Sequence, residues 1–197
     1  MDSYGGSIEN RCRFPMEVVK AVTKAVGAGK VGMRLSPYNY FQDTRDSNPN
    51  SHWAYLCEQI AMQPAENRLA YIHMVEPRFD EVLDEQAKLD ALAKTTKTDL
   101  NSQSLVPFRR ILKKGNVLFV AAGNFNRDNA LGKIDSGDAD AIVFGRWFIA
   151  NPDLPTRLAK GLPLNPYDRD SFYGADPPSK GYIDYPFHQP EAVKVVA

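Results

Sequence analysis

Two apolar runs dominate the second half of the sequence. Val117–Ala122 and Ala141–Phe144 consist almost entirely of small and β-branched apolar residues, which is typical of strands buried in a parallel sheet. Each run is followed by a glycine and a polar residue, Gly123-Asn124 and Gly145-Arg146. The pattern predicts two neighbouring parallel strands whose glycine turns lie at the same sheet edge, where α/β folds carry their ligands.

A pair of glycine turns at one sheet edge has a chemical use. Glycine lets backbone N–H groups approach an anion closely, a following helix adds its positive end, and Arg146 supplies a fixed planar charge. A phosphate monoester is the simplest ligand for this combination. One glycine turn alone is more simply a tight connection from a strand to a helix, but two at matching strand ends favour an anion site.

The first part of the sequence alternates helical and strand patterns. Ser7 is placed to cap a helix that runs to about Val26. The strand Val31–Leu35 follows. Apolar residues recur at helical spacing within the predicted helix: Ile8, Phe14, Val18, Val22 and Val26.

The alternation continues along the chain. The pattern predicts a helix over His52–Ala61, a strand over Leu69–Val75, a helix over Ser104–Lys114 and a helix over Asp153–Lys160. This last helix is expected to begin with Asn151 as its cap. Residues 79–98 are charged and helix-permissive, and we expect an excursion over the rim of the sheet. The chain beyond residue 161 is rich in Pro, Tyr and Asp and predicts an irregular tail.

The four predicted strands define the fold class. Strands near residues 31, 69, 117 and 141, each followed by a helix, indicate successive right-handed βαβ units in one α/β domain covering residues 1–197. Four such units make half of an eight-stranded barrel, or alternatively a small open doubly wound sheet. Both architectures place ligands at the carboxyl edge of the sheet.

Two polar residues interrupt the apolar strands. Arg34 lies within the first strand, where an unpaired buried charge would be costly. It either pairs with a neighbouring strand, with Glu76 as the candidate, or stabilises an electron-rich cofactor at the mouth of the barrel. His73 lies within the second strand, and a single histidine on an apolar strand is more simply a hydrogen-bonded core residue than a ligand or base.

Composition excludes several classes of function. Lys+Arg and Asp+Glu are both 24, so the net charge is zero and nucleic acid is not an expected partner. Cys12 and Cys57 are far apart and lack metal-ligand spacing, and no metal site is predicted. No apolar run reaches the length of a membrane span and the N-terminus lacks the apolar core of a signal peptide. We expect a cytoplasmic protein that does not bind a membrane.

Six motifs, in order along the chain, resemble the carboxyl-terminal half of the old yellow enzyme family. They are YGGSIENRCRF, VGMRLSPY, HMVEP, AAGNF, FGRWFIANPDLPTRL and LPLNPYDRDSFYG with GYIDYP. The resemblance covers nearly the whole chain apart from residues 79–98. It implies a TIM barrel that binds FMN, takes hydride from NADPH and reduces activated carbon–carbon double bonds of enals and enones. In similar fungal proteins it also implies aldehyde substrates of secondary metabolism.

The resemblance assigns cofactor contacts residue by residue. Arg34 matches an arginine beside the pyrimidine edge of the flavin, where a cation stabilises the negative charge that accumulates on reduction. The FMN phosphate site is matched by both predicted glycine turns: Gly123, Asn124, Gly145 and Arg146.

The resemblance also assigns a substrate pocket. Phe41 and Gln42 fall in the loop that lines it, and Gln42 replaces an asparagine found in some relatives. Phe172 and Tyr173 match a pair in the tail near the flavin and the substrate. Plain packing of the tail on the rim is the alternative explanation for this pair.

The resemblance places the family's substrate-binding His-Asn or His-His pair and its proton-donating tyrosine before the YGGS motif. We therefore expect no catalytic residue within this chain. A half barrel leaves open strand edges and an uncovered apolar face, so we expect self-association or pairing with a complementing amino-terminal half. Two functions remain open: an FMN-dependent NADPH:alkene oxidoreductase or a half of one, and a non-catalytic relic that keeps a flavin-phosphate or interaction surface.

Overall fold

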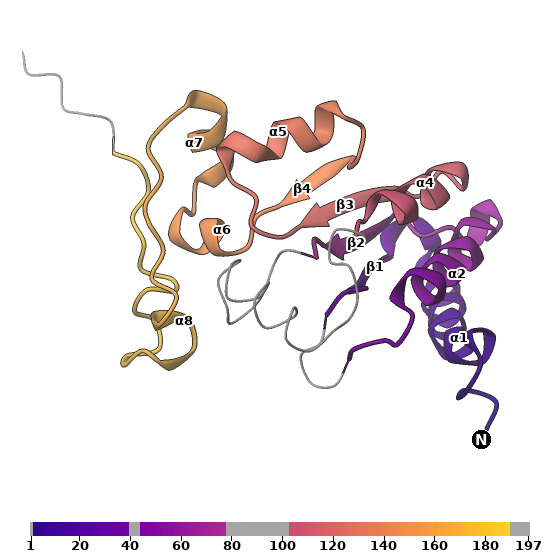
Figure 1. The fold of residues 1–197 in the computed structure, drawn as a ribbon. Helices are drawn as coiled ribbons and strands as arrows, with labels where there is room; N and C mark the ends of the chain where they lie inside the picture. Colours follow the sequence, from indigo (N-terminus) through magenta and orange to yellow (C-terminus); the bar gives the residue numbers. More distant parts are fainter. Residues whose placement is uncertain (1, 40–43, 78–102, 190–197) are drawn as a thin grey trace, which may run out of the picture. The chain divides into compact units, whose positions relative to one another are not determined.

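A computed structural model describes residues 2–39, 44–77 and 103–189 of the chain. They fall into two units, Met1–Val143 and Phe144–Ala197. The centre of the first unit is a four-stranded parallel sheet in the order β1-β2-β3-β4 (Figure 1). Its strands are β1 (Gly32–Leu35), β2 (Tyr71–Val75), β3 (Leu118–Ala122) and β4 (Ala141–Val143).

The helices of the first unit follow the predicted alternation. They are α1 (Ile8–Val26), α2 (Pro49–Ala61), α4 (Val106–Lys114) and α5 (Arg127–Asp135), with short 3₁₀ turns η1 (Ala28–Lys30) and η3 (Ala65–Asn67). All four predicted strands and the α/β class are confirmed. Helix α2 begins at Pro49, earlier than predicted, because the Asn48 side chain accepts a hydrogen bond from the Ser51 N–H and Pro49 occupies the first turn.

One face of the sheet is covered by helices. Ile72 and Met74 of β2, and Phe119 and Ala121 of β3, are all 0% exposed. Helices α1, α2 and α4 lie beside one another and cover this face (Figure 1). The residues they bury include Cys12, Met16, Leu56, Ile60, Phe108 and Leu112. This layer is the core of the first unit, as expected when parallel strands are covered by crossover helices.

The opposite face of the sheet is more open. Its residues alternate with the buried ones, and Tyr71 and Leu118 on it are 43% and 56% exposed. Within the described residues, β1 and β4 form the two edges of the sheet. The predicted open edges and partly uncovered face are therefore present in the described part of the first unit.

The apolar spacing in α1 does not mark its buried face. Ser7 caps the helix as predicted, with its hydroxyl oxygen accepting from the Asn10 N–H. However, Phe14 and Val18 are 61% and 41% exposed. The buried side chains are instead Cys12, Met16, Val19 and Thr23. Helix α1 thus carries apolar residues on two faces, and the described part of the first unit covers one of them.

The described part of the second unit contains three short helices and an extended tail. The helices are α6 (Arg146–Ala150), α7 (Leu154–Lys160) and α8 (Ser171–Gly174). The prediction that Asn151 caps α7 is wrong, because α7 begins three residues later. Asn151 is 0% exposed, and its side-chain NH₂ donates to the carbonyls of Trp147 and Asn165 at 2.9 and 3.1 Å. The residue fixes a turn rather than a helix start.

Across the described residues, no helix is long and apolar enough to cross a membrane. Residues 79–98, predicted to form an excursion over the rim, lie entirely outside the described residues, as do Phe41 and Gln42.

Candidate functional site

The turn after β3 has an unusual backbone. Gly123 and Asn124 both adopt positive φ, 120° and 51°, a conformation that glycine and asparagine tolerate best. The Asn124 carbonyl accepts a hydrogen bond from the Asn129 side chain at 3.2 Å. Asn126 then caps α5 in a reciprocal pair with Asn129. A side chain of α5 therefore stabilises the turn.

The turns predicted after β3 and β4 do follow neighbouring strand ends. Ala122, the last residue of β3, pairs in parallel register with Val143, the last residue of β4. Both strands thus end at the same edge of the sheet in the first unit. This confirms the parallel neighbours on which the prediction of an anion site depended.

The second glycine turn belongs to the second unit. Gly145 precedes α6 with φ −89°, and Arg146 is the first residue of that helix. A Cβ added at Gly145 would meet nothing within 4 Å. The glycine is therefore not required by neighbouring protein atoms, and there is open space beside its backbone. Helix α6 has five residues, so its dipole is weak.

Arg34 lies on the open face of the sheet. It is exposed, whereas Leu35 beside it is buried. The alternative that Arg34 pairs with Glu76 is wrong, because the Glu76 carboxylate is bound by Lys133 of α5 at 2.9 Å. An exposed guanidinium avoids the cost that burial would have imposed, and it can bind an anion on this face.

His73 shares that face with Arg34. The two residues are register partners on β2 and β1, and partners in adjacent strands point to the same side. Burial lowers the pKa of the His73 imidazole, and the Arg34 charge lowers it further. The Nε2 atom is buried without a hydrogen-bond partner among the described residues. The prediction of a hydrogen-bonded core histidine is therefore not met at this nitrogen.

The tail residues differ in exposure. Phe172 is 7% exposed and Tyr173 is 89% exposed. The Phe172 ring lies 6.0 Å from the Tyr167 ring and 6.4 Å from the Tyr182 ring, measured between centroids. Phe172 thus packs within the second unit, whereas Tyr173 presents its ring outward. Their place in a substrate pocket stays a prediction.

An ionic cluster holds the segment before α2. The Asp46 carboxylate is bound by Arg11 at 2.7 Å and by the His52 Nδ1. Burial would raise the pKa of Asp46, but the Asn48 N–H, His52 and Arg11 outweigh it and lower that pKa. The cluster joins the start of α1 to the segment that follows β1. Sequence reasoning missed it because its three side chains come from separate elements.

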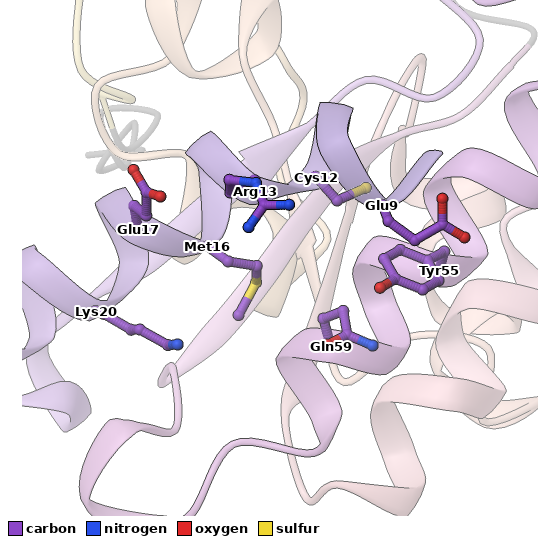
Figure 2. Close-up of a pocket in the computed structure, with 8 residues that line it drawn as sticks. All are labelled: Glu9, Cys12, Arg13, Met16, Glu17, Lys20, Tyr55 and Gln59. Atoms are coloured by element: carbon purple, nitrogen blue, oxygen red, sulfur yellow. The ribbon is translucent and has the colours of Figure 1, made fainter. Parts of the chain in front are cut away.

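A groove lies between α1 and α2, with a volume of about 270 Å³ (Figure 2). Charged and polar side chains line much of it, and the lining also includes the buried Cys12, whose pKa burial raises to about 11. A thiol of this kind is unreactive near neutral pH. None of the predicted cofactor or substrate residues lines this groove, so it is separate from the candidate site.

These residues fit the flavin that the sequence resemblance implies. Arg34 offers an exposed cation beside a buried imidazole nitrogen that lacks a described partner. Gly123 and Asn124 form a positive-φ turn at the carboxyl edge of the same sheet. The open space at Gly145 leaves its backbone accessible to an anion. The donors suit a phosphate and the electron-rich edge of an isoalloxazine.

The parallel sheet, its crossover helices and the polar groups at its carboxyl edge define an α/β protein of the kind that binds ligands at that edge. The profile of the NADH:flavin oxidoreductase / NADH oxidase family matches residues 1–165. The chain belongs to this family, and its resemblance to old yellow enzymes is confirmed.

Two curated relatives show the extent of the likeness. Flavin oxidoreductase hxnT of Emericella nidulans is 61% identical over 188 residues, which cover 95% of this chain and 48% of that protein. Putative 12-oxophytodienoate reductase 3 of Oryza sativa subsp. japonica is 45% identical over 186 residues, covering 94% of this chain and 44% of that protein. The chain therefore spans about half the length of the curated relatives it matches.

The solved structures agree with the fold. Morphinone reductase superposes with a TM-score of 0.74 at 36% identity, covering 98% of this chain and 46% of that chain. A complex of morphinone reductase with tetrahydroNAD gives a TM-score of 0.73, covering 96% of this chain and 44% of that chain. The four-stranded sheet is thus part of a TIM barrel, and the open doubly wound alternative is not supported.

Proposed function

We propose that the chain forms the FMN-binding part of an NADPH-dependent oxidoreductase that reduces the activated carbon–carbon double bond of enals and enones. The observation that carries the proposal is the exposed Arg34 on the open face of a sheet whose carboxyl edge bears the Gly123-Asn124 turn. Each unit contributes contacts of its own. Arg34, Gly123 and Asn124 belong to the first unit, and Gly145 and Arg146 belong to the second.

The chain's residues act by binding and by electrostatics. When bound, FMN supplies the hydride-transfer chemistry. Arg34 stabilises negative charge at the pyrimidine edge of the flavin, which favours the reduced form. The backbone N–H groups at the glycine turns bind the phosphate, and Arg146 adds a planar cation that can bind two phosphate oxygens. Tyr173 and Phe172, with Phe41 and Gln42, are proposed to line the substrate side.

The names of the relatives support the substrate class and the hydride donor. Reductases of 12-oxophytodienoate and of morphinone are among the proteins that match. Morphinone reductase has been solved with tetrahydroNAD, which supports a nicotinamide as the donor. We assign NADPH on the family resemblance alone.

The described part of the first unit leaves surfaces open on which a partner would pack. The open edges of β1 and β4 and the exposed apolar side of α1 are surfaces on which a complementing segment or a second copy would pack. We propose that such an assembly supplies the side chains that bind the substrate carbonyl and donate its proton. We propose that the protein is cytoplasmic, since thiols such as that of Cys12 stay reduced in that compartment.

The isolated chain is expected to bind FMN without reducing enones. The resemblance places the substrate-binding pair and the proton donor outside the six motifs found here. The measurement is NADPH consumption with cyclohexenone by purified chain supplied with FMN. No turnover above free FMN is expected. Clear turnover by pure chain would show that the catalytic groups are present here.

The substitution Gly145→Ala is expected to weaken FMN binding by about tenfold to a hundredfold, since a methyl group keeps the phosphate from the backbone and removes a charged hydrogen bond worth about 1.5–3 kcal/mol. The added methyl group would meet no protein atom within 4 Å, so the free energy of unfolding should change by less than about 0.5 kcal/mol. The measurement is FMN fluorescence quenching on titration with protein.

The matched control is Gly132→Ala, a glycine in α5 that also has nothing within 4 Å of an added Cβ. This change should leave FMN affinity unaltered. Equal affinity of the Gly145→Ala and parent chains would remove this turn from the proposed phosphate site.

A further inference from the structure

His73 is a half-buried titratable group that the proposed function does not yet use. Its Nε2 atom is buried and has no hydrogen-bond partner among the described residues. Buried polar atoms in folded proteins are almost always paired. An unpaired imidazole nitrogen therefore calls for a donor or acceptor that binds it in the working protein.

The two side chains are not hydrogen-bonded in the described structure, but Arg34 is the charged register partner of His73 and is therefore best placed to become that donor. It is the register partner of His73 in the adjacent strand, so the two side chains leave the same face of the sheet. On the other side, the register partner of His73 is Val120 of β3, which pairs in turn with Ala141 of β4. Both are uncharged. Glu76, which directly follows β2, is bound by Lys133. Arg34 is thus the one charged residue in this row of described residues.

The chemistry of the pair requires a neutral imidazole. A guanidinium only donates hydrogen bonds, and a histidine accepts one only when it is neutral. Burial and the Arg34 charge both lower the pKa of His73, which favours the neutral form near neutral pH. An imidazolium in this position would instead repel Arg34 and leave both cations without a described counter-charge.

We propose that His73 is a positioning residue, whose neutral imidazole accepts a hydrogen bond at Nε2 from the Arg34 guanidinium and holds that charge toward the anionic edge of the flavin. This inference rests on the proposed function for its ligand but not for the coupling between the two side chains. The remaining N–H groups of Arg34 stay available to the flavin. FMN affinity should therefore fall as the pH drops through the range in which His73 takes up a proton.

The first experiment needs no flavin. The imidazole signals of His73 are titrated by NMR in the parent chain and in Arg34→Gln, with the assignment taken from the signal lost in His73→Gln. Removal of the Arg34 charge is expected to raise the pKa of His73. An unchanged titration would show that the side chains are not coupled, and it would overturn the inference whether or not FMN binds.

The second experiment measures FMN affinity across pH. His73→Leu should bind FMN about tenfold more weakly than the parent above the histidine range, the size of one charge-assisted hydrogen bond. His73→Gln keeps an acceptor near the Nε2 position, so it should restore affinity to within about twofold and remove the acid dependence. His188→Gln is the matched control and should behave as the parent does.

The outcomes separate the two proposals. Equal FMN affinity in the parent and His73→Leu, or an acid dependence that survives in His73→Gln, would overturn the positioning role while leaving flavin binding intact. If NMR shows the coupling but the parent binds no FMN at any pH, the proposed function fails. The positioning role of His73 toward the flavin then fails together with the proposed function, and only the coupling between Arg34 and His73 is supported.

Discussion

Replacing Asp140 by alanine is expected to lower the free energy of unfolding of the first unit by about 3 kcal/mol, at the lower end for breaking a buried ion pair because the carboxylate is partly exposed. One Asp140 oxygen binds the Arg109 guanidinium at 2.6 Å, and the other accepts from the Phe119 N–H at 2.7 Å. Arg109 is only 7% exposed. The substitution would leave that cation and the Phe119 N–H of β3 without this partner.

Two further variants show which bond matters. Asp140→Asn keeps an acceptor for Phe119 but removes the charge, so it should cost less than alanine. The double variant Asp140→Ala with Arg109→Met should be more stable than Asp140→Ala alone, because no unpaired cation remains. The measurement is urea unfolding monitored by the fluorescence of Trp53. Trp147 is replaced by Phe in every variant, because it is the other of the two tryptophans of the chain. A loss below about 0.5 kcal/mol in Asp140→Ala would contradict the account.

Replacing Arg157 by leucine is expected to release the tail of the second unit. Arg157 is 2% exposed. Its guanidinium donates to the Pro163 and Pro186 carbonyls at 2.9 Å each and to the Asn165 side chain at 3.2 Å. At about 1 kcal/mol for each bond, the second unit should lose about 3 kcal/mol. The Nε bond to Asp153 at 2.6 Å adds to this loss.

Arg157→Lys is the informative control for this change. Lysine keeps the charge beside Asp153 but lacks the planar fork that reaches three oxygen atoms at once. It should restore only a minor part of the stability. The measurement is thermolysin cleavage within the tail, together with Trp147 fluorescence in urea with Trp53 replaced by Phe. Equal protease resistance of the parent and Arg157→Leu would show that the tail is held by its aromatic packing instead.

The strands could be predicted because their signal is local. A near-continuous apolar run such as Val117–Ala122, closed by a glycine, is short enough to be a strand and too apolar to be exposed. The observed β3 and β4 differ from the predicted ranges by one residue at one end each. Parallel order followed from connection lengths and handedness.

The buried face of α1 could not be found in the same way. Both Met16 and Phe14 belong to apolar series at helical spacing, and the sequence does not say which series the rest of the fold covers. The described structure buries Met16 and leaves Phe14 61% exposed. Periodicity identifies a helix, but it identifies the buried face only when one apolar face is present.

The candidate site was predictable in part. The glycine turns could be predicted because they directly follow apolar strands. Arg34 could be predicted because it is a charged residue within an apolar run. His73 alternates along β2 with the buried Ile72 and Met74 and so lies on the same side as the exposed Tyr71. The strand register that brings His73 beside Arg34 could not be predicted from the sequence. The Arg109–Asp140 pair, 31 residues apart, likewise depends on register and leaves no local signal.

The most direct test of the central claim is a visible absorbance spectrum of the purified chain after incubation with FMN and desalting. We expect a retained flavin band close to one FMN per chain, and a clearly smaller band for Gly145→Ala under the same conditions. A colourless parent chain with intact helical and strand content would contradict the claim that these residues form a flavin-binding site.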